Sequence, residues 1–159
     1  MSFVVLGVDP GLLKTGFGVI DYSGNSPKYL TSGVLLMKST EPHPVRLAFI
    51  FKSLKEIIDK YSPKVISIEE TFVNKNPSTS LTLGYARSVV LTLAGLYEIE
   101  LSEYSPNHIK KTITGNGHAD KEQVKYMVQK LLSTSLPIKT YDESDALAIA
   151  LTYHKPLKF

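Results

Sequence analysis

The chain has 159 residues, the length of a single domain, and a chain of this size buries roughly 70% of its extended surface on folding. It contains no cysteine, which excludes disulfides, thiolate zinc sites, iron–sulfur clusters and thiol nucleophiles. No apolar stretch approaches the about 20 residues that span a bilayer, and the first residues lack the pattern of a signal peptide. We therefore expect residues 1–159 to form one domain in the cytoplasm, with no membrane association.

The positive charge is concentrated in one part of the sequence. Eighteen Lys and Arg residues against fifteen Asp and Glu residues give a net charge of +3. Residues 105–130 hold five lysines and only two acidic residues, so this stretch carries the whole net charge. A basic stretch can be a solvated surface or a nucleic-acid contact, and charge alone leaves both open.

The N-terminal third has the pattern of an antiparallel β-meander. Residues 3–8, 16–22 and 28–37 are predicted strands, because each is rich in apolar or β-branched residues and turn residues separate them. The first strand is followed by Asp9-Pro10-Gly11, and the turn at residues 23–27 predicts a hairpin.

Helical periodicity then replaces alternation. Apolar residues recur at helical spacing from Leu47 to Ile58, and Pro63 follows. Residues 64–68 predict a strand that leads into Glu69-Glu70 and a polar loop over residues 74–80. Residues 81–97 predict a helix that is apolar on nearly every side, which indicates a central position, a subunit interface, or both.

The last third alternates strand and helix. Residues 99–104 predict a fifth strand, and Pro106 suits the first turn of a helix. Capping boxes at Asp120 and Gln123, and at Thr140 and Glu143, predict helices over residues 121–132 and from 140 to about 154. Strands first, then strands alternating with helices, indicate an α/β domain with a mixed sheet.

Acidic residues follow two of the predicted strands and open the last helix. Asp9 and the pair Glu69-Glu70 come at strand ends, where ligands bind in open α/β sheets. Asp142 and Asp145 are three residues apart and so share one helix face. Singly, each residue is typical of a turn or a helix start. Together they would repel one another without cations, and oxygen ligands favour Mg²⁺ or Mn²⁺; two such ions about 4 Å apart suit displacement at phosphorus.

The sequence resembles the RuvC-type Holliday-junction resolvases from about residue 3 to residue 153. Five motifs in family order and spacing carry this resemblance. They are Gly7-Val8-Asp9-Pro10-Gly11 with Thr15-Gly16-Phe17-Gly18, Ile68-Glu69-Glu70-Thr71-Phe72, Leu83-Gly84-Tyr85-Ala86-Arg87, Gly115-Asn116-Gly117-His118-Ala119-Asp120-Lys121, and Asp142-Glu143-Ser144-Asp145-Ala146-Leu147-Ala148.

The resemblance implies a ribonuclease-H-like fold, with a mixed five-stranded sheet and helices on both faces. It implies a homodimer that nicks two symmetric strands of four-way junction DNA in recombination and repair, with a RuvA–RuvB branch-migration complex as partner. It also implies two Mg²⁺ ions per active site, which Mn²⁺ can replace, held by Asp9, Glu69, Asp142 and Asp145. Glu69 matches the family's catalytic position, whereas Glu70 stands where relatives often carry Gln.

Lysines and one aromatic residue are the predicted DNA contacts. Lys110, Lys111 and Lys121 match family positions implicated in DNA binding, and Lys121 is also expected to stabilise charge on the reacting phosphate. Phe72 is expected to stack on a base unpaired at the junction centre, with Lys75 as a further contact in the same loop. The alternatives are core packing for Phe72 and simple solvation for Lys110 and Lys111.

Three other functions remain open at this point. A ribonuclease-H-like nuclease acting on RNA or non-junction DNA would share the carboxylates, but the final Asp pair and the motif at residues 115–121 argue against it. A sugar-kinase or actin-like ATPase also has an Asp-x-Gly loop like residues 9–11, but it needs two such domains. A non-catalytic junction-binding module would gain nothing from four carboxylates that face phosphates.

Overall fold

A mixed five-stranded sheet forms the centre of the computed structural model, which describes residues 3–71, 75–135 and 137–153. The strand order is β3-β2-β1-β4-β5. β2 pairs antiparallel with β1 and β3, and β4 pairs parallel with β1 and β5. The bounds are Val4–Asp9 for β1, Lys14–Asp21 for β2, Lys28–Leu36 for β3, Val65–Glu69 for β4 and Glu100–Tyr104 for β5. The predicted meander and mixed sheet are confirmed.

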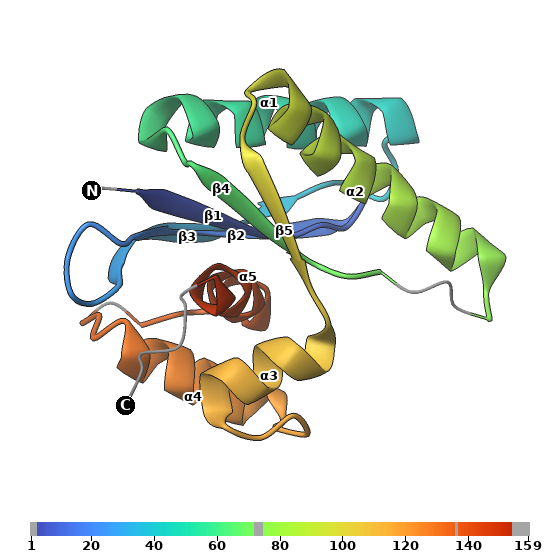
Figure 1. The fold of residues 1–159 in the computed structure, drawn as a ribbon. Helices are drawn as coiled ribbons and strands as arrows, with labels where there is room; N and C mark the ends of the chain where they lie inside the picture. Colours follow the sequence, from blue (N-terminus) through green and yellow to red (C-terminus); the bar gives the residue numbers. More distant parts are fainter. Residues whose placement is uncertain (1–2, 72–74, 136, 154–159) are drawn as a thin grey trace.

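Helices cover both faces of the sheet (Figure 1). α1 (His43–Tyr61) and α2 (Pro77–Leu96) lie on one face, and α3 (Pro106–Thr114), α4 (Lys121–Leu131) and α5 (Tyr141–Thr152) lie on the other. Successive side chains of β1 point to opposite faces of the sheet and so enter two hydrophobic cores. Leu6 and Val8 pack with α1 and α2, whereas Val5 packs with α3, α4 and α5. Within the described ranges, no helix combines the length and hydropathy that a bilayer span requires.

Local capping chemistry sets the helix starts. Both predicted capping boxes are present, at Asp120 with Gln123 and at Thr140 with Glu143. The prediction for residues 74–80 is wrong from residue 77 onward, because α2 begins at Pro77 rather than at residue 81. Asn76 accepts hydrogen bonds from the backbone N–H groups two and three residues later, and proline suits the first helical position.

Glycines let α5 pack directly on β1 and β2. A Cβ atom at Gly16 would overlap the carbonyl oxygen of Asp142, and one at Gly7 would overlap the carbonyl oxygen of Ala146. Gly16, on β2, lies opposite the first turn of α5, and Gly7, on β1, lies opposite Ala146 and Ala150 further along the helix. This close approach brings the acidic first turn of α5 beside the end of β1, where Asp9 lies.

Candidate active site

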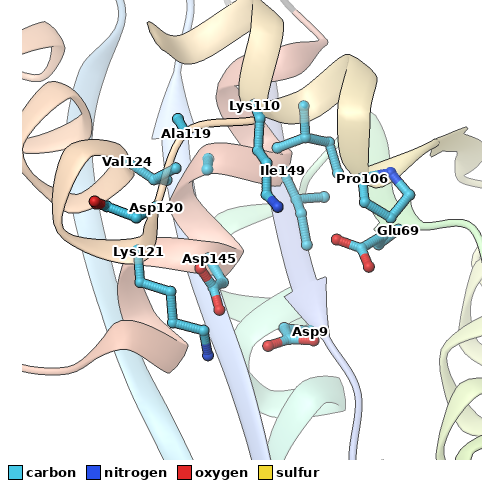
Figure 2. Close-up of a pocket in the computed structure, with 12 residues that line it drawn as sticks. Asp9, Glu69, Pro106, Lys110, Ala119, Asp120, Lys121, Val124, Asp145 and Ile149 are labelled. Carbon is cyan, nitrogen blue, oxygen red and sulfur yellow. The ribbon is translucent and has the colours of Figure 1, made fainter. Parts of the chain in front are cut away.

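A cavity of about 470 Å³ opens where β1 and β4 end. Asp9 is the last residue of β1, Glu69 is the last residue of β4, and both line the cavity. Asp145 from α5, Lys110 from α3 and Lys121 from α4 also line it, and Figure 2 shows these five side chains around one space. Asp120, which caps α4, is a further charged lining residue. Five elements far apart in the chain therefore bring together five residues predicted from the sequence.

A second hollow continues from the cavity along the end of β4. It has a volume of about 240 Å³ and shares Asp9 and Glu69 with the larger cavity. Its further lining includes Glu70 and Thr71, the two residues that follow β4. Asp9 and Glu69 therefore line both hollows.

The loop after β1 is fixed by a buried threonine. The Thr15 hydroxyl donates to the carbonyl oxygen of Gly11 at 2.8 Å and accepts from its backbone N–H at 3.1 Å, and Thr15 is fully buried. The register pairs Asp9 with Gly16, the next residue along β2. These contacts hold the end of β1 in place, so the Asp9 carboxylate is directed by both the sheet and the loop.

Burial and mutual repulsion perturb the carboxylates that line the cavity. Burial, together with the charges of Asp145, Glu69 and Asp142, raises the pKa of Asp9 to about 7, while the charge of Lys121 opposes the rise. Burial also raises the pKa of Glu69, with a further contribution from Asp145 and opposition from Lys110.

The pKa of Asp145 is also raised. Burial raises its pKa, the charges of Lys121 and Lys110 lower it, and the charge of Asp142 raises it. The carboxylates thus act on one another through space, and the two lysines offset only part of their repulsion.

The donor set fits a hard divalent cation. The acidic side chains offer only oxygen ligands, which Mg²⁺ and Mn²⁺ prefer, and a cation would relieve the repulsion that raises the pKa of Asp9. In the part of the chain that the structure describes, no three His, Asp or Glu side chains already form a compact metal cluster. The carboxylates surround a space instead, so metal binding requires their side chains to turn inward.

Of the other predicted site residues that the structure describes, Asp142, Lys75 and Lys111 lie outside the cavity lining. Asp142 is half-buried and reaches the site electrostatically, through its effects on Asp9 and Asp145. Lys75 and Lys111 are exposed and do not line the cavity. Phe72 falls outside the described residues, so its expected stacking role stays a prediction.

Tyr141 lies next to the site through its contact with Lys121, which the sequence did not reveal. Its ring lies 5.8 Å from the Lys121 ammonium and 5.5 Å from the Lys125 ammonium, and its hydroxyl donates to the Glu122 carboxylate. The ring holds Lys121 and Lys125 together although like charges four residues apart on a helix repel. The only signal in the sequence was its position immediately before Asp142.

The fold and this site together define a class of protein. A mixed sheet in the order β3-β2-β1-β4-β5, with acidic residues at the ends of its neighbouring parallel strands and on the helix that packs against them, is the arrangement of the ribonuclease-H-like nucleases. The family model described as Crossover junction endodeoxyribonuclease RuvC matches residues 5–153, and the chain belongs to this family.

Relatives and solved structures agree with this membership. A crossover junction endodeoxyribonuclease RuvC of Rickettsia felis is 45% identical over 151 residues, which cover 95% of this chain and 97% of the relative. The Rickettsia prowazekii protein of the same name is 46% identical over 149 residues, 94% of this chain and 95% of the relative. The structure of Thermus thermophilus RuvC in complex with Holliday junction substrate matches with a TM-score of 0.88 and 31% identity, over 94% of this chain and 92% of that one. The resemblance read from the motifs is confirmed.

Proposed function

We propose that this protein is a Mg²⁺-dependent endonuclease that resolves four-way DNA junctions by nicking two symmetric strands, in recombination and repair in the cytoplasm. The observation that carries the proposal is the single cavity that Asp9, Glu69 and Asp145 share with Lys110 and Lys121. Family membership supports the substrate, since one relative's structure contains a Holliday junction. By the same analogy, a RuvA–RuvB branch-migration complex is the proposed protein partner.

The carboxylates and lysines have separate tasks in this proposal. Asp9, Glu69, Asp142 and Asp145 would hold two Mg²⁺ ions, with Mn²⁺ as a substitute. Such a pair of ions supplies the activation of the attacking water and the stabilisation of the leaving 3′ oxygen. Lys121 and Lys110, on opposite sides of the cavity, would neutralise the scissile phosphate and stabilise its growing charge.

Further DNA contacts would lie around the cavity. Lys75 and Lys111 are exposed, so both are free to meet the phosphate backbone. Phe72 is proposed to stack on a base at the junction centre. Lysine contacts of this kind release counterions, so binding should weaken steeply as salt increases.

Helix α2 is the proposed interface of a homodimer. Its buried stripe packs on the sheet, whereas Leu81, Gly84, Ser88, Leu91 and Gly95 are exposed along another stripe at spacings of three and four residues. A Cβ atom at Gly84 or Gly95 would meet nothing within 4 Å, so these positions leave room for close approach of a second helix. A two-fold dimer would present two equivalent sites to two equivalent strands.

Neutralising one cavity carboxylate tests the catalytic proposal. We expect Asp145→Asn to bind a labelled four-way junction as the wild type does and to lose Mg²⁺-dependent cutting by a factor of at least about 10³, because a metal ligand is lost while the fold is kept. Binding is measured in EDTA by gel shift, and nicks are mapped after Mg²⁺ is added. An equal-length duplex and an RNA–DNA hybrid are run beside the junction to test selectivity.

Asp59→Asn is the matched control for this substitution. Asp59 lies on α1, on the opposite face of the sheet, where it pairs with Lys55 at 2.7 Å and accepts a hydrogen bond from the Tyr97 hydroxyl at 2.6 Å. We expect this variant to cut at the wild-type rate. Cutting by Asp145→Asn at the wild-type rate would show that the proposed metal site is wrong, and equal cutting of duplex or hybrid would refute junction selectivity.

A further inference from the structure

Arg87 joins helix α2 to the end of the strand that carries Glu69. One guanidinium nitrogen, Nη1, donates to the backbone carbonyl oxygen of Glu69 at 2.9 Å and lies 3.5 Å from the Thr71 hydroxyl. The other, Nη2, makes an ion pair with the Glu103 carboxylate on β5. The Arg87 side chain is 16% exposed and the Glu103 side chain 38%, so the contact with Glu69 is partly buried whereas the ion pair with Glu103 is open to water. One side chain thus connects α2, β4 and β5.

The Glu69 carbonyl lies where the sheet stops. Glu69 is the last residue of β4, and the backbone N–H of Glu70 still donates to the Tyr104 carbonyl at 2.8 Å. The Arg87 guanidinium donates the hydrogen bond that the Glu69 carbonyl oxygen accepts. A hydrogen bond from a charged donor is stronger than one between neutral groups. Fixing this peptide group fixes the Cα–Cβ direction of Glu69, and therefore the place of its carboxylate in the cavity.

Arg87 also belongs to the helix proposed as the dimer interface. Gly84 and Leu91, at three residues before and four residues after Arg87, are its neighbours on the helix surface and are exposed. A second copy packed on that stripe would restrict the motion of α2 beside Arg87. The hydrogen bond to Glu69 then links the packing of two subunits to the geometry of each cavity.

We propose that Arg87 is a positioning residue, which holds the end of β4 against α2 and so keeps the Glu69 carboxylate oriented for the metal. This inference rests on the proposed function, because it assumes that Glu69 is a metal ligand. Supporting residues around metal ligands typically alter metal affinity 10–100-fold when they are removed. Arg87 has no contact with the metal in this scheme and acts only through the Glu69 backbone.

The test uses two readouts that do not depend on cutting. The first is the Mg²⁺ concentration that gives half of the Mg²⁺-induced rise in melting temperature of the full-length protein. The second is hydrogen exchange of the Glu70 amide in metal-free protein. For Arg87→Ala we expect the Mg²⁺ midpoint to rise about tenfold and the Glu70 amide to exchange about tenfold faster, with junction binding in EDTA unchanged.

Three further variants separate positioning from charge and from general loss of stability. Arg87→Lys keeps the charge, but one ammonium cannot reach Glu69 and Glu103 together in the geometry of a planar fork, so the Mg²⁺ midpoint should still rise. Glu103→Gln removes the ion pair and leaves the Glu69 contact, so it should shift the midpoint less than Arg87→Ala. Val90→Ala makes a cavity on the buried side of α2, where Val90 is 1% exposed, and should lower the melting temperature without moving the midpoint.

Each outcome decides one point. Equal Mg²⁺ midpoints and equal Glu70 exchange in Arg87→Ala and the wild type would overturn the inference. So would a midpoint shift in Val90→Ala as large as that in Arg87→Ala, because the effect would then follow stability alone. If the wild type shows no Mg²⁺ response at all, the proposed metal site fails, whereas the Glu70 exchange rate still tests whether Arg87 holds the end of β4.

Discussion

Asp9 occupies an environment that disfavours its own charge. Burial and three neighbouring carboxylates raise its pKa to about 7, from an ordinary value of 3.8. The folded protein therefore binds a proton at Asp9 between about pH 4 and pH 7, where the unfolded chain has released it. The associated contribution to stability is present in full below pH 4 and is lost as the pH rises through 7.

Substitution of Asp9 should make metal-free protein more stable above neutral pH. In EDTA at pH 8 we expect Asp9→Asn to melt at a higher temperature than the wild type, because the amide carries no charge among the other carboxylates. At pH 4 the two melting temperatures should be close. The measurement is thermal unfolding followed by circular dichroism from pH 4 to pH 8.

Mg²⁺ should reverse the order of the melting temperatures of the wild type and Asp9→Asn at pH 8. At pH 8, added Mg²⁺ should raise the melting temperature of the wild type, since binding to the folded state alone is stabilising, and it should raise that of Asp9→Asn much less. A wild type and variant with the same dependence on pH in EDTA would show that Asp9 is not destabilised by its surroundings.

At the scale of elements, the contact of α5 with β1 and β2 places the acidic first turn of the helix. Gly16 lies beneath the Asp142 carbonyl, and a side chain there would collide with backbone, which cannot rotate away. We expect Gly16→Ala to lower the free energy of unfolding by about 1–3 kcal/mol, as overpacking does. The displaced helix should also lose most of its stabilisation by Mg²⁺.

Gly24→Ala provides the comparison for this substitution. A Cβ atom at Gly24, in the turn before β3, would have its nearest neighbour 4.0 Å away. The change should therefore leave the free energy of unfolding and the stabilisation by Mg²⁺ near their wild-type values. Denaturant titration with and without Mg²⁺ gives both quantities. Full Mg²⁺ stabilisation in Gly16→Ala would mean that the position of α5 does not control the site.

Local signals predicted the elements, and packing supplied what they could not. The capping boxes at Asp120 and Thr140 were readable because each involves residues three positions apart. The α2 start was missed because the Asn76 cap and Pro77 lie in a polar stretch that lacks an apolar stripe. The reach of Arg87 to Glu69 spans 18 residues and depends on how α2 packs against the sheet, so no local pattern contains it.

In the candidate site, too, local sequence predicted some features and only packing determined the others. Position at a strand end was enough to select Asp9 and the pair Glu69-Glu70, because the carboxyl ends of parallel neighbours meet at one edge. The four-carboxylate assignment, which separated Glu69 from Glu70, came from the family resemblance. The side chain of Tyr141 and its two lysines come together only when α4 and α5 pack, which sequence spacing does not determine.

At the scale of the whole molecule, the exposed stripe of α2 predicts how subunits meet. We expect Leu91→Lys to convert the proposed homodimer to folded monomers, because a charge at this 40% exposed position would be buried in the proposed interface. Sedimentation velocity measures the oligomeric state, and circular dichroism checks the fold. The monomer should lose the paired cutting of two strands.

Leu131→Lys is the control for exposure and charge. Leu131 is 42% exposed and lies on α4, on the other face of the sheet, so this variant should remain dimeric. Dimers of Leu91→Lys at the same concentration would place the subunit interface elsewhere on the molecule.

The order of elements along the chain also determines when the protein can acquire its activity during synthesis. Asp9 leaves the ribosome early, on β1, but Asp145 belongs to α5, the last helix of the described chain. Until α5 docks, Gly7 and Gly16 have no partner helix and the acidic cluster is incomplete. Under the proposed function, we expect a nascent chain that carries only β1 to β5 to be unable to cut DNA. We expect cleavage competence to arrive late in synthesis, when the final helix packs against the first two strands.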